Sequence, residues 1–167
     1  MYRIGFSKDI HSLVEGRKLI ISGVTIDYDK GEDAYSDGDV LYHAVSEAIL
    51  GALAKGDLGM HFPNNDPKNK NISSEIIVRY VKDLMEKNNY KIVNIDTQIV
   101  LEKPKLRQYI DKMKHNLASL LDTDVENISI KAGTNEGNDA TGRNEAIEVY
   151  ASVLLKKQTR KGGNEDN

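Results

Sequence analysis

Apolar residues recur with two different periods along this chain of 167 residues, and the change from one period to the other limits the folds it can adopt. A spacing of three and four residues predicts amphipathic helices, and strict alternation predicts half-buried strands. Both patterns occur, so we expect an α+β domain in which a mixed β-sheet has helices packed on one side. The helical segments are 37–55, 74–87 and 104–121, and the extended segments are 2–6, 18–22, 24–28, 90–102, 127–132 and 146–155.

Composition narrows the class of protein further. Lys and Arg number 23 against 26 Asp and Glu, a net charge of −3, which argues against the basic field of a nucleic-acid-binding protein. No apolar run reaches the roughly 18 residues of a membrane span, and no targeting segment precedes the first strand, so we expect a cytoplasmic protein without a membrane partner. We expect one domain over residues 1–157 and a disordered polar tail over 158–167.

The chain has no cysteine, which leaves His, Asp and Glu as its possible metal ligands. His43 lies on the first predicted helix, well away from the apolar stripe. Asp39 and Glu47 are four residues to either side, so one of these carboxylates could hold the imidazole nitrogen that a metal does not use. A solvated polar helix face would use the same residues.

Asp9 and His11 are two residues apart in an extended segment, so their side chains project to the same side. With His43 they would form a carboxylate and two imidazoles, a suitable set for a catalytic zinc with an open fourth position. A chance surface pair is an equal alternative for Asp9 and His11. His61 and His115 are expected to be solvated.

Basic residues concentrate at two places despite the negative net charge. Lys103, Lys105 and Arg107 follow the strand over 90–102, while Lys131 and Arg143 flank a Gly-rich stretch. If the two regions meet, they form a basic pocket suited to phosphates; a solvated helix end is the alternative.

The Gly-rich stretch itself, 132–137, matches no nucleotide-binding fingerprint. Its backbone amides could approach an anion, and Glu136 offers a hard oxygen ligand suited to magnesium. A plain turn would use the same residue types.

The segment Ser-Asp-Gly-Asp-Val-x-x-His-Ala at 36–44, followed by Gly56-Asp57-Leu58-Gly59 and Phe62-Pro63, resembles the signature of the 2-C-methyl-D-erythritol 2,4-cyclodiphosphate synthase family. The resemblance extends to Asp9-x-His11, Pro104-Lys105, Lys131-Ala132-x-Thr134-x-Glu136 and Thr141-Gly142-Arg143-x-Glu145, always in family order. It covers about residues 2–157.

The resemblance implies a lyase of the non-mevalonate isoprenoid pathway that cyclises 4-diphosphocytidyl-2-C-methyl-D-erythritol 2-phosphate and releases CMP. It implies a homotrimer with active sites between subunits, and Arg143 and Glu145 around the trimer axis. It also implies zinc on Asp9, His11 and His43, magnesium or manganese on Glu136, and transition-state stabilisation by Thr134. The implied substrate contacts are Asp9, His11, Tyr35, Ser36, Asp57, Leu58, Gly59, Phe62, Pro63, Asn64, Asn65, Asp66, Leu101, Glu102, Lys103, Pro104, Lys105, Leu106, Arg107, Ala132, Gly133, Thr134, Asn135, Glu136, Ala140 and Arg143.

The chain departs from the family pattern at several of these positions. Tyr35 stands where the family usually has a His credited with transition-state stabilisation, and Tyr is not cationic at neutral pH. Asn64 stands for Asp, Ala140 for Phe and Glu47 for Asp. A second hypothesis is therefore a relative that binds cytidine nucleotide or prenyl diphosphate with zinc and does not turn over.

Overall fold

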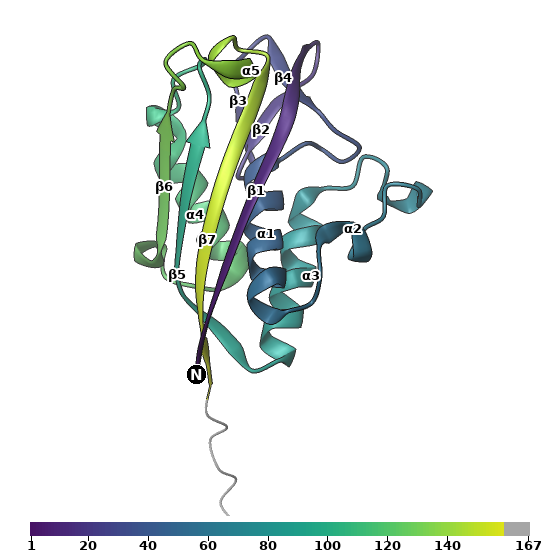
Figure 1. The fold of residues 1–167 in the computed structure, drawn as a ribbon, viewed down its shortest axis with the longest axis vertical. Helices are drawn as coiled ribbons and strands as arrows, with labels where there is room; N and C mark the ends of the chain where they lie inside the picture. Colours follow the sequence, from purple (N-terminus) through teal and green to yellow (C-terminus); the bar gives the residue numbers. More distant parts are fainter. Residues whose placement is uncertain (159–167) are drawn as a thin grey trace, which may run out of the picture.

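A five-stranded mixed sheet with the strand order β4-β1-β7-β5-β6 forms one layer of the computed structural model, which describes residues 1–158 (Figure 1). Only β5 and β6 run parallel, and every other neighbouring pair in this sheet is antiparallel. The expected mixed sheet is confirmed. The predicted disordered tail lies, except for its first residue, outside the described residues. The strands of the sheet are β1 (Tyr2–Glu15), β4 (Lys30–Asp33), β5 (Tyr90–Val100), β6 (Ile128–Gly133) and β7 (Ala146–Lys157); β2 (Leu19–Ile21) and β3 (Val24–Ile26) form a separate hairpin.

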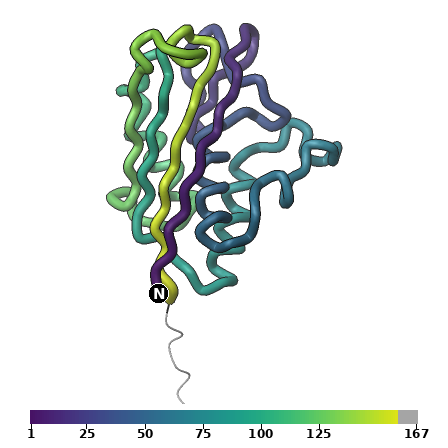
Figure 2. The backbone as a smooth tube through the Cα atoms, in the orientation of Figure 1, coloured from purple at the N-terminus to yellow at the C-terminus, as the bar shows by residue number. Residues whose placement is uncertain are grey.

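Strand β1 is much longer than the predicted strand over 2–6, because it has partners along its whole length. It pairs with β7 from Tyr2↔Lys156 to Ser12↔Ala146, and its last residues pair with β4. The residues of β4, Lys-Gly-Glu-Asp, are types common in loops, yet they form the edge of the sheet. The two ends of the described chain lie side by side, and the Lys157 N–H donates a hydrogen bond to the Met1 carbonyl at 2.9 Å (Figure 2).

Three helices cover one face of the sheet, as expected. Helix α1 packs against β1 and β7, while α4 packs against β6. The helix predicted from residue 104 begins only at residue 110, because the preceding segment leads through a 3₁₀ turn. None of the helices in residues 1–158 combines the length and apolar character needed to cross a membrane. The long helices are α1 (Val40–Leu53), α3 (Ser74–Lys87) and α4 (Ile110–Leu121); the short ones are α2 (Leu58–His61), α5 (Asp139–Gly142) and the 3₁₀ turns η1 (Pro67–Asn69), η2 (Arg107–Tyr109) and η3 (Val125–Asn127).

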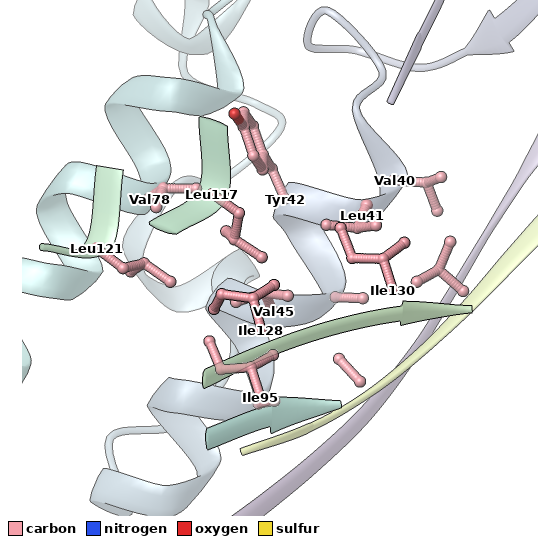
Figure 3. Close-up of a cluster of buried hydrophobic side chains, with 14 of the residues drawn as sticks. Val40, Leu41, Tyr42, Val45, Val78, Ile95, Leu117, Leu121, Ile128 and Ile130 are labelled. Carbon is pink, nitrogen blue, oxygen red and sulfur yellow. The ribbon is translucent and has the colours of Figure 1, made fainter. Parts of the chain in front are cut away.

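The core lies between the helices and the sheet, where the apolar stripes of α1, α3 and α4 meet the inward face of the strands (Figure 3). Burial of each large aliphatic side chain there contributes about 1.5–3 kcal/mol. The opposite face of the sheet exposes large apolar side chains of β1. The labelled core residues of Figure 3 are Val40, Leu41, Tyr42, Val45, Val78, Ile95, Leu117, Leu121, Ile128 and Ile130, and the exposed apolar residues of β1 are Tyr2, Ile4, Phe6 and Ile10.

A bulge in β5 interrupts the alternation of buried and exposed residues along this strand. The register of β5 against β7 shifts between Ile92 and Asn94, so the inserted residue Val93 does not point into the core. Ile92 is buried before the bulge and Ile95 after it, while Val93 is only half-buried. Uniform alternation over the predicted strand 90–102 would put Val93 on the same face as the buried residues Ile95, Thr97, Ile99 and Leu101.

Helix α1 approaches β1 very closely at Gly5. A Cβ atom on Gly5 would lie 1.9 Å from the carbonyl oxygen of Ala48, so only glycine permits this packing. Two residues along, the buried Ser7 hydroxyl donates a hydrogen bond to the carbonyl of Ala44. These contacts fix α1 against the part of β1 that precedes Asp9.

Asp39 caps α1, so this helix begins at Val40 and not at residue 37 as predicted. Its side chain accepts a hydrogen bond from the Tyr42 N–H at 3.1 Å. It also accepts from the N–H groups of Ser22 and Gly23 at 2.9 and 2.7 Å. These two residues form the β2–β3 turn and both have positive φ angles, as a two-residue hairpin turn requires. Asp39 therefore joins the start of α1 to the small hairpin.

Candidate active site

Three side chains that can bind a metal meet where α1 crosses β1. Asp9 and His11 project to the same side of β1, as predicted, and His43 faces them from α1. Asp9 Oδ2 lies 3.3 Å from His11 Nε2 and 3.4 Å from His43 Nδ1. One ligand atom from each residue lies within 4.8 Å of the others. Ligand atoms around tetrahedral zinc, with bonds of about 2.0–2.1 Å, are about 3.3 Å apart, so the donor set fits such a cation.

The remaining ring nitrogens face hydrogen-bond partners on the other side. His11 Nδ1 lies 3.1 Å from the Gly38 carbonyl oxygen, and since a carbonyl only accepts, Nδ1 carries a hydrogen. His43 Nε2 lies 3.1 Å from Ser36 Oγ and 2.9 Å from Ser74 Oγ. Each ring therefore directs its other nitrogen toward Asp9.

The prediction that Asp39 or Glu47 holds the second nitrogen of His43 is wrong. The Asp39 side chain is fully buried, and both of its carboxylate oxygens accept hydrogen bonds from the β2–β3 turn. Glu47 lines the same cavity as His43, but no side-chain hydrogen bond joins these two residues of the described chain. Ser36 is adjacent to the motif, whereas Ser74 is 31 residues from His43, so local spacing gave no signal for it.

The surroundings of Asp9 keep its carboxylate ionised, as binding of a cation requires. Burial alone would raise the pKa of Asp9, but hydrogen bonds from His11 and His43 outweigh burial and hold that pKa well below its usual range. Burial would lower the pKa of His11, yet the contact with Asp9 leaves it raised. Burial, with the charges of Asp57 and Asp9, raises the pKa of Glu47. Asp9 is thus the ionised carboxylate of the cluster.

A cavity of about 420 Å³ opens in front of the three metal-binding side chains. One wall is the segment over residues 57–72, which we call the substrate loop. Two backbone hydrogen bonds and one from the Tyr35 hydroxyl to the Asp66 carbonyl at 3.3 Å hold this loop to residues 35–37. The cavity brings together nine of the predicted site residues: Asp9, His11, Tyr35, Ser36, His43, Leu58, Gly59, Phe62 and Asn64.

His61 anchors the substrate loop and is not simply solvated as predicted. Its Nδ1 lies 2.9 Å from the Tyr80 hydroxyl, and its Nε2 lies 2.9 Å from the Lys55 carbonyl. The side chain of His115 is exposed and contacts a carbonyl of its own helix, in agreement with the prediction.

A second cavity, of about 590 Å³, lies where β5 and β6 end. It joins the segment after β5 to the start of the Gly-rich stretch, so these two regions meet as the basic-pocket hypothesis required. Three of the five basic residues do not line this cavity: Lys103, Lys131 and Arg143. Lys131 pairs with Asp96 at 2.7 Å, and Arg143 pairs with Glu145 at 3.1 Å. The predicted residues that line this cavity are Leu101, Glu102, Pro104, Lys105, Leu106, Arg107, Ala132, Gly133 and Thr134.

The two cavities share no lining residue, so the chain by itself does not bring all the predicted site residues together. Glu136 is exposed beyond the second cavity, where its carboxylate accepts a hydrogen bond from the Thr134 hydroxyl at 3.1 Å. The predicted residues that line neither cavity are Asp57, Pro63, Asn65, Asp66, Lys103, Asn135, Glu136, Ala140 and Arg143.

Comparison with known proteins identifies the family of the chain. The model of the YgbB family matches residues 2–156. The chain belongs to this family. Family members named 2-C-methyl-D-erythritol 2,4-cyclodiphosphate synthase include one from Brachyspira hyodysenteriae, 53% identical over 155 residues, covering 93% of this chain and 98% of that protein. Another, from Chloroherpeton thalassium, is 50% identical and covers 93% of this chain and 99% of its own length.

Solved structures of family members have the same fold. A structure of IspF from Plasmodium falciparum in complex with CDP has a TM-score of 0.84 at 34% identity and covers 95% of this chain and 97% of that one. The bifunctional IspDF from Campylobacter jejuni has a TM-score of 0.91 at 37% identity; the match covers 95% of this chain but only 43% of the bifunctional protein. The family model spans residues 2–156 and so includes the segments that carry Asp9, His11 and His43.

Proposed function

We propose that the chain converts 4-diphosphocytidyl-2-C-methyl-D-erythritol 2-phosphate to 2-C-methyl-D-erythritol 2,4-cyclodiphosphate with release of CMP, in the non-mevalonate route to isoprenoids. The observation that carries this proposal is the convergence of Asp9, His11 and His43 at a cavity closed by the substrate loop, in a chain that belongs to the YgbB family. The CDP complex named for a family member supports a cytidine nucleotide as the bound part of the substrate.

Asp9, His11 and His43 are the residues that would hold zinc, and Glu136 would hold magnesium or manganese beside Thr134. The donor types support this division, because imidazole nitrogens suit zinc, and a lone carboxylate suits a hard cation that keeps most of its waters. A divalent cation bound at either site neutralises charge on phosphate oxygens as a Lewis acid.

The reaction requires no strong general base from the protein, because the attacking phosphate is already ionised. An oxygen of the 2-phosphate, already an anion, forms a bond to the β-phosphorus, and the bond from that phosphorus to the oxygen bridging to the α-phosphate breaks. The electron pair leaves with this oxygen as CMP. The residues therefore have to align the phosphates and stabilise charge. The hydroxyls of Thr134 and Tyr35 would donate to the substrate after leaving their present acceptors, the Glu136 carboxylate and the Asp66 carbonyl. Ser36 and the substrate loop would hold the methylerythritol phosphate, while the second cavity would hold cytidine.

A homotrimer with active sites between subunits would unite the two cavities. The exposed apolar residues of β1, including Ile4 at 77% and Phe6 at 65% exposure, lie together on the uncovered sheet face and supply a surface for association. In this arrangement Arg143 and Glu145 would lie near the trimer axis. Residues 1–157 would form the single domain of each subunit. A cytoplasmic location and the absence of a nucleic-acid partner stay predictions.

The second hypothesis, a zinc-dependent binder without turnover, is not favoured. It rested on Tyr35 and Ala140, but the three metal-binding side chains are in place, and Tyr35 still presents a hydroxyl group to the cavity wall. The curated relatives described above are all named as synthases.

Incubation of the protein with the diphosphocytidyl substrate, zinc and magnesium tests the proposal. We expect release of CMP and the phosphorus NMR signal of a cyclic diphosphate. The His43→Ala variant should lose both, while His115→Ala, which changes an exposed imidazole on α4, should keep them. CMP release by wild type at the level of His43→Ala would refute the activity.

A further inference from the structure

The metal-facing ring of His43 is held from behind by residues with no assigned role. Ser74 is the first residue of α3, and its side chain is completely buried. Its Oγ lies 2.9 Å from His43 Nε2, the nitrogen directed away from Asp9. The Ser74 hydroxyl donates to Asp37 Oδ1, and the Ser74 N–H donates to Asp37 Oδ2 at 3.0 Å. Both oxygens of the Asp37 carboxylate are therefore used on Ser74.

The direction of these hydrogen bonds fixes the tautomer of His43. A carboxylate only accepts, so the Ser74 hydroxyl hydrogen points to Asp37, and Ser74 Oγ can offer His43 only lone pairs. His43 Nε2 must then carry a hydrogen, so in the neutral ring that binds a metal the free lone pair is on Nδ1, the nitrogen facing Asp9. Ser36 Oγ, 3.1 Å from the same nitrogen, is a second acceptor placed by the Gly38 N–H.

The same contacts join the imidazole to the substrate loop. Ser74 lies two residues after the end of this loop in the chain. Asp37 is fastened to the loop independently, because its N–H donates to the Ile72 carbonyl at 3.1 Å.

We propose that Ser74 and Asp37 are positioning residues for His43, which hold its Nε2–H tautomer and ring orientation and link this metal ligand to the end of the substrate loop. This inference rests on the metal site of the proposed function. Outer partners of metal-binding histidines commonly change metal affinity by 10- to 100-fold when they are removed.

Metal affinity of purified protein, measured by competition with a chromophoric chelator for zinc and for cobalt, tests the inference. We expect Ser74→Ala to bind each metal about 10- to 100-fold more weakly than wild type. The control is Ser73→Ala, since Ser73 is exposed and makes no side-chain capping bond. Ser74→Thr retains the hydroxyl and should rescue affinity. Asp37→Asn keeps one acceptor oxygen without the charge, should show a smaller loss, and serves if Ser74→Ala does not fold.

Two further measurements separate positioning from a general loss of structure. The Nε2–H proton of His43 should give a protected signal in a nitrogen–proton NMR spectrum of the zinc-loaded protein, absent in Ser74→Ala. Unfolding temperatures without metal show how much Ser74 matters to the fold alone. Equal metal affinities of wild type, Ser73→Ala and Ser74→Ala would overturn this inference only, whereas wild type that binds no metal would overturn the proposed site and the inference with it.

Discussion

Gly5 lies directly beneath the backbone carbonyl of Ala48, at the crossing of β1 and α1 that brings Asp9 and His11 opposite His43. The space for a side chain at Gly5 is filled by that carbonyl. The distance between the two halves of the metal cluster therefore depends on a residue that takes no part in the chemistry.

Substitution of Gly5 by Ala should move α1 away from β1. We expect a loss of about 1–3 kcal/mol in the free energy of unfolding, as for other overpacked interiors, together with weaker zinc binding. The control is Gly51→Ala, because a Cβ at Gly51 meets nothing within 4 Å and alanine favours a helix. Chemical denaturation and zinc titration measure both effects; a Gly5→Ala variant as stable as Gly51→Ala contradicts the packing argument.

Glu32 gives stability a pH dependence of unusual sign. Burial, and then the charge of Asp39, raises the pKa of the Glu32 carboxyl well above its ordinary value. Above the unfolded pKa of 4.5, the folded state therefore holds a proton that the unfolded state has lost, and stability falls as the pH rises. The slope is at most about 1.4 kcal/mol per pH unit. Glu32→Gln should remove this slope, whereas the exposed Asp33→Asn should not. Parallel pH profiles of wild type and Glu32→Gln would show that Glu32 ionises freely.

Tyr35 tests whether a neutral hydroxyl limits the reaction. Tyr35→His introduces a side chain that can carry positive charge beside the substrate phosphates. Since charge-assisted hydrogen bonds are about twice as strong as neutral ones, we expect about a tenfold rise in kcat for CMP release. Tyr35→Phe should lower kcat and loosen the substrate loop, because it loses the bond to the Asp66 carbonyl. An unchanged kcat in Tyr35→His would indicate that position 35 does not act on the transition state.

The trimer proposal predicts that a charge on the uncovered sheet face separates the subunits. Phe6→Asp should give a monomer by light scattering and lose CMP release, because the two cavities would no longer meet. Ile76→Asp changes a residue of 53% exposure on α3 and should stay trimeric and active. Active, monomeric Phe6→Asp protein would place a complete active site within one subunit.

Variants of Arg107 and Lys103 distinguish two causes of nucleotide binding: contact with the lining of the second cavity, and the overall basic charge near it. Arg107 lines this cavity and Lys103 does not, although both side chains are exposed. Arg107→Ala should therefore weaken CDP binding in calorimetry by about tenfold, the loss of one charge-assisted contact, and Lys103→Ala should leave it near wild type. Equal losses in the two variants would indicate that only overall charge attracts the nucleotide.

Local patterns in the sequence were sufficient to predict the long helices, most of the strands and the three metal-binding side chains. Period and spacing describe contacts within a few residues, and Asp9, His11 and His43 each stand on a regular element. The predictions were wrong or incomplete where contacts between segments distant in sequence determine the structure. The bulge at Val93 depends on pairing with β7, and Ser74 reaches His43 only because α3 packs beside α1. Lys131 is not part of the predicted basic pocket, because it forms an ion pair with Asp96 on the adjacent strand.

The pairing of β1 with β7 joins the beginning of the described chain to its end, residue 2 opposite residue 156. Synthesis runs from one end to the other, so β1 leaves the ribosome long before its central partner exists. Contacts of such large sequence separation are slow to form and leave strand edges unprotected meanwhile. Asp9 and His11 lie on β1, which stays without this partner until β7 has been synthesised. A newly made chain therefore cannot complete its metal cluster on a finished sheet until translation has passed residue 156.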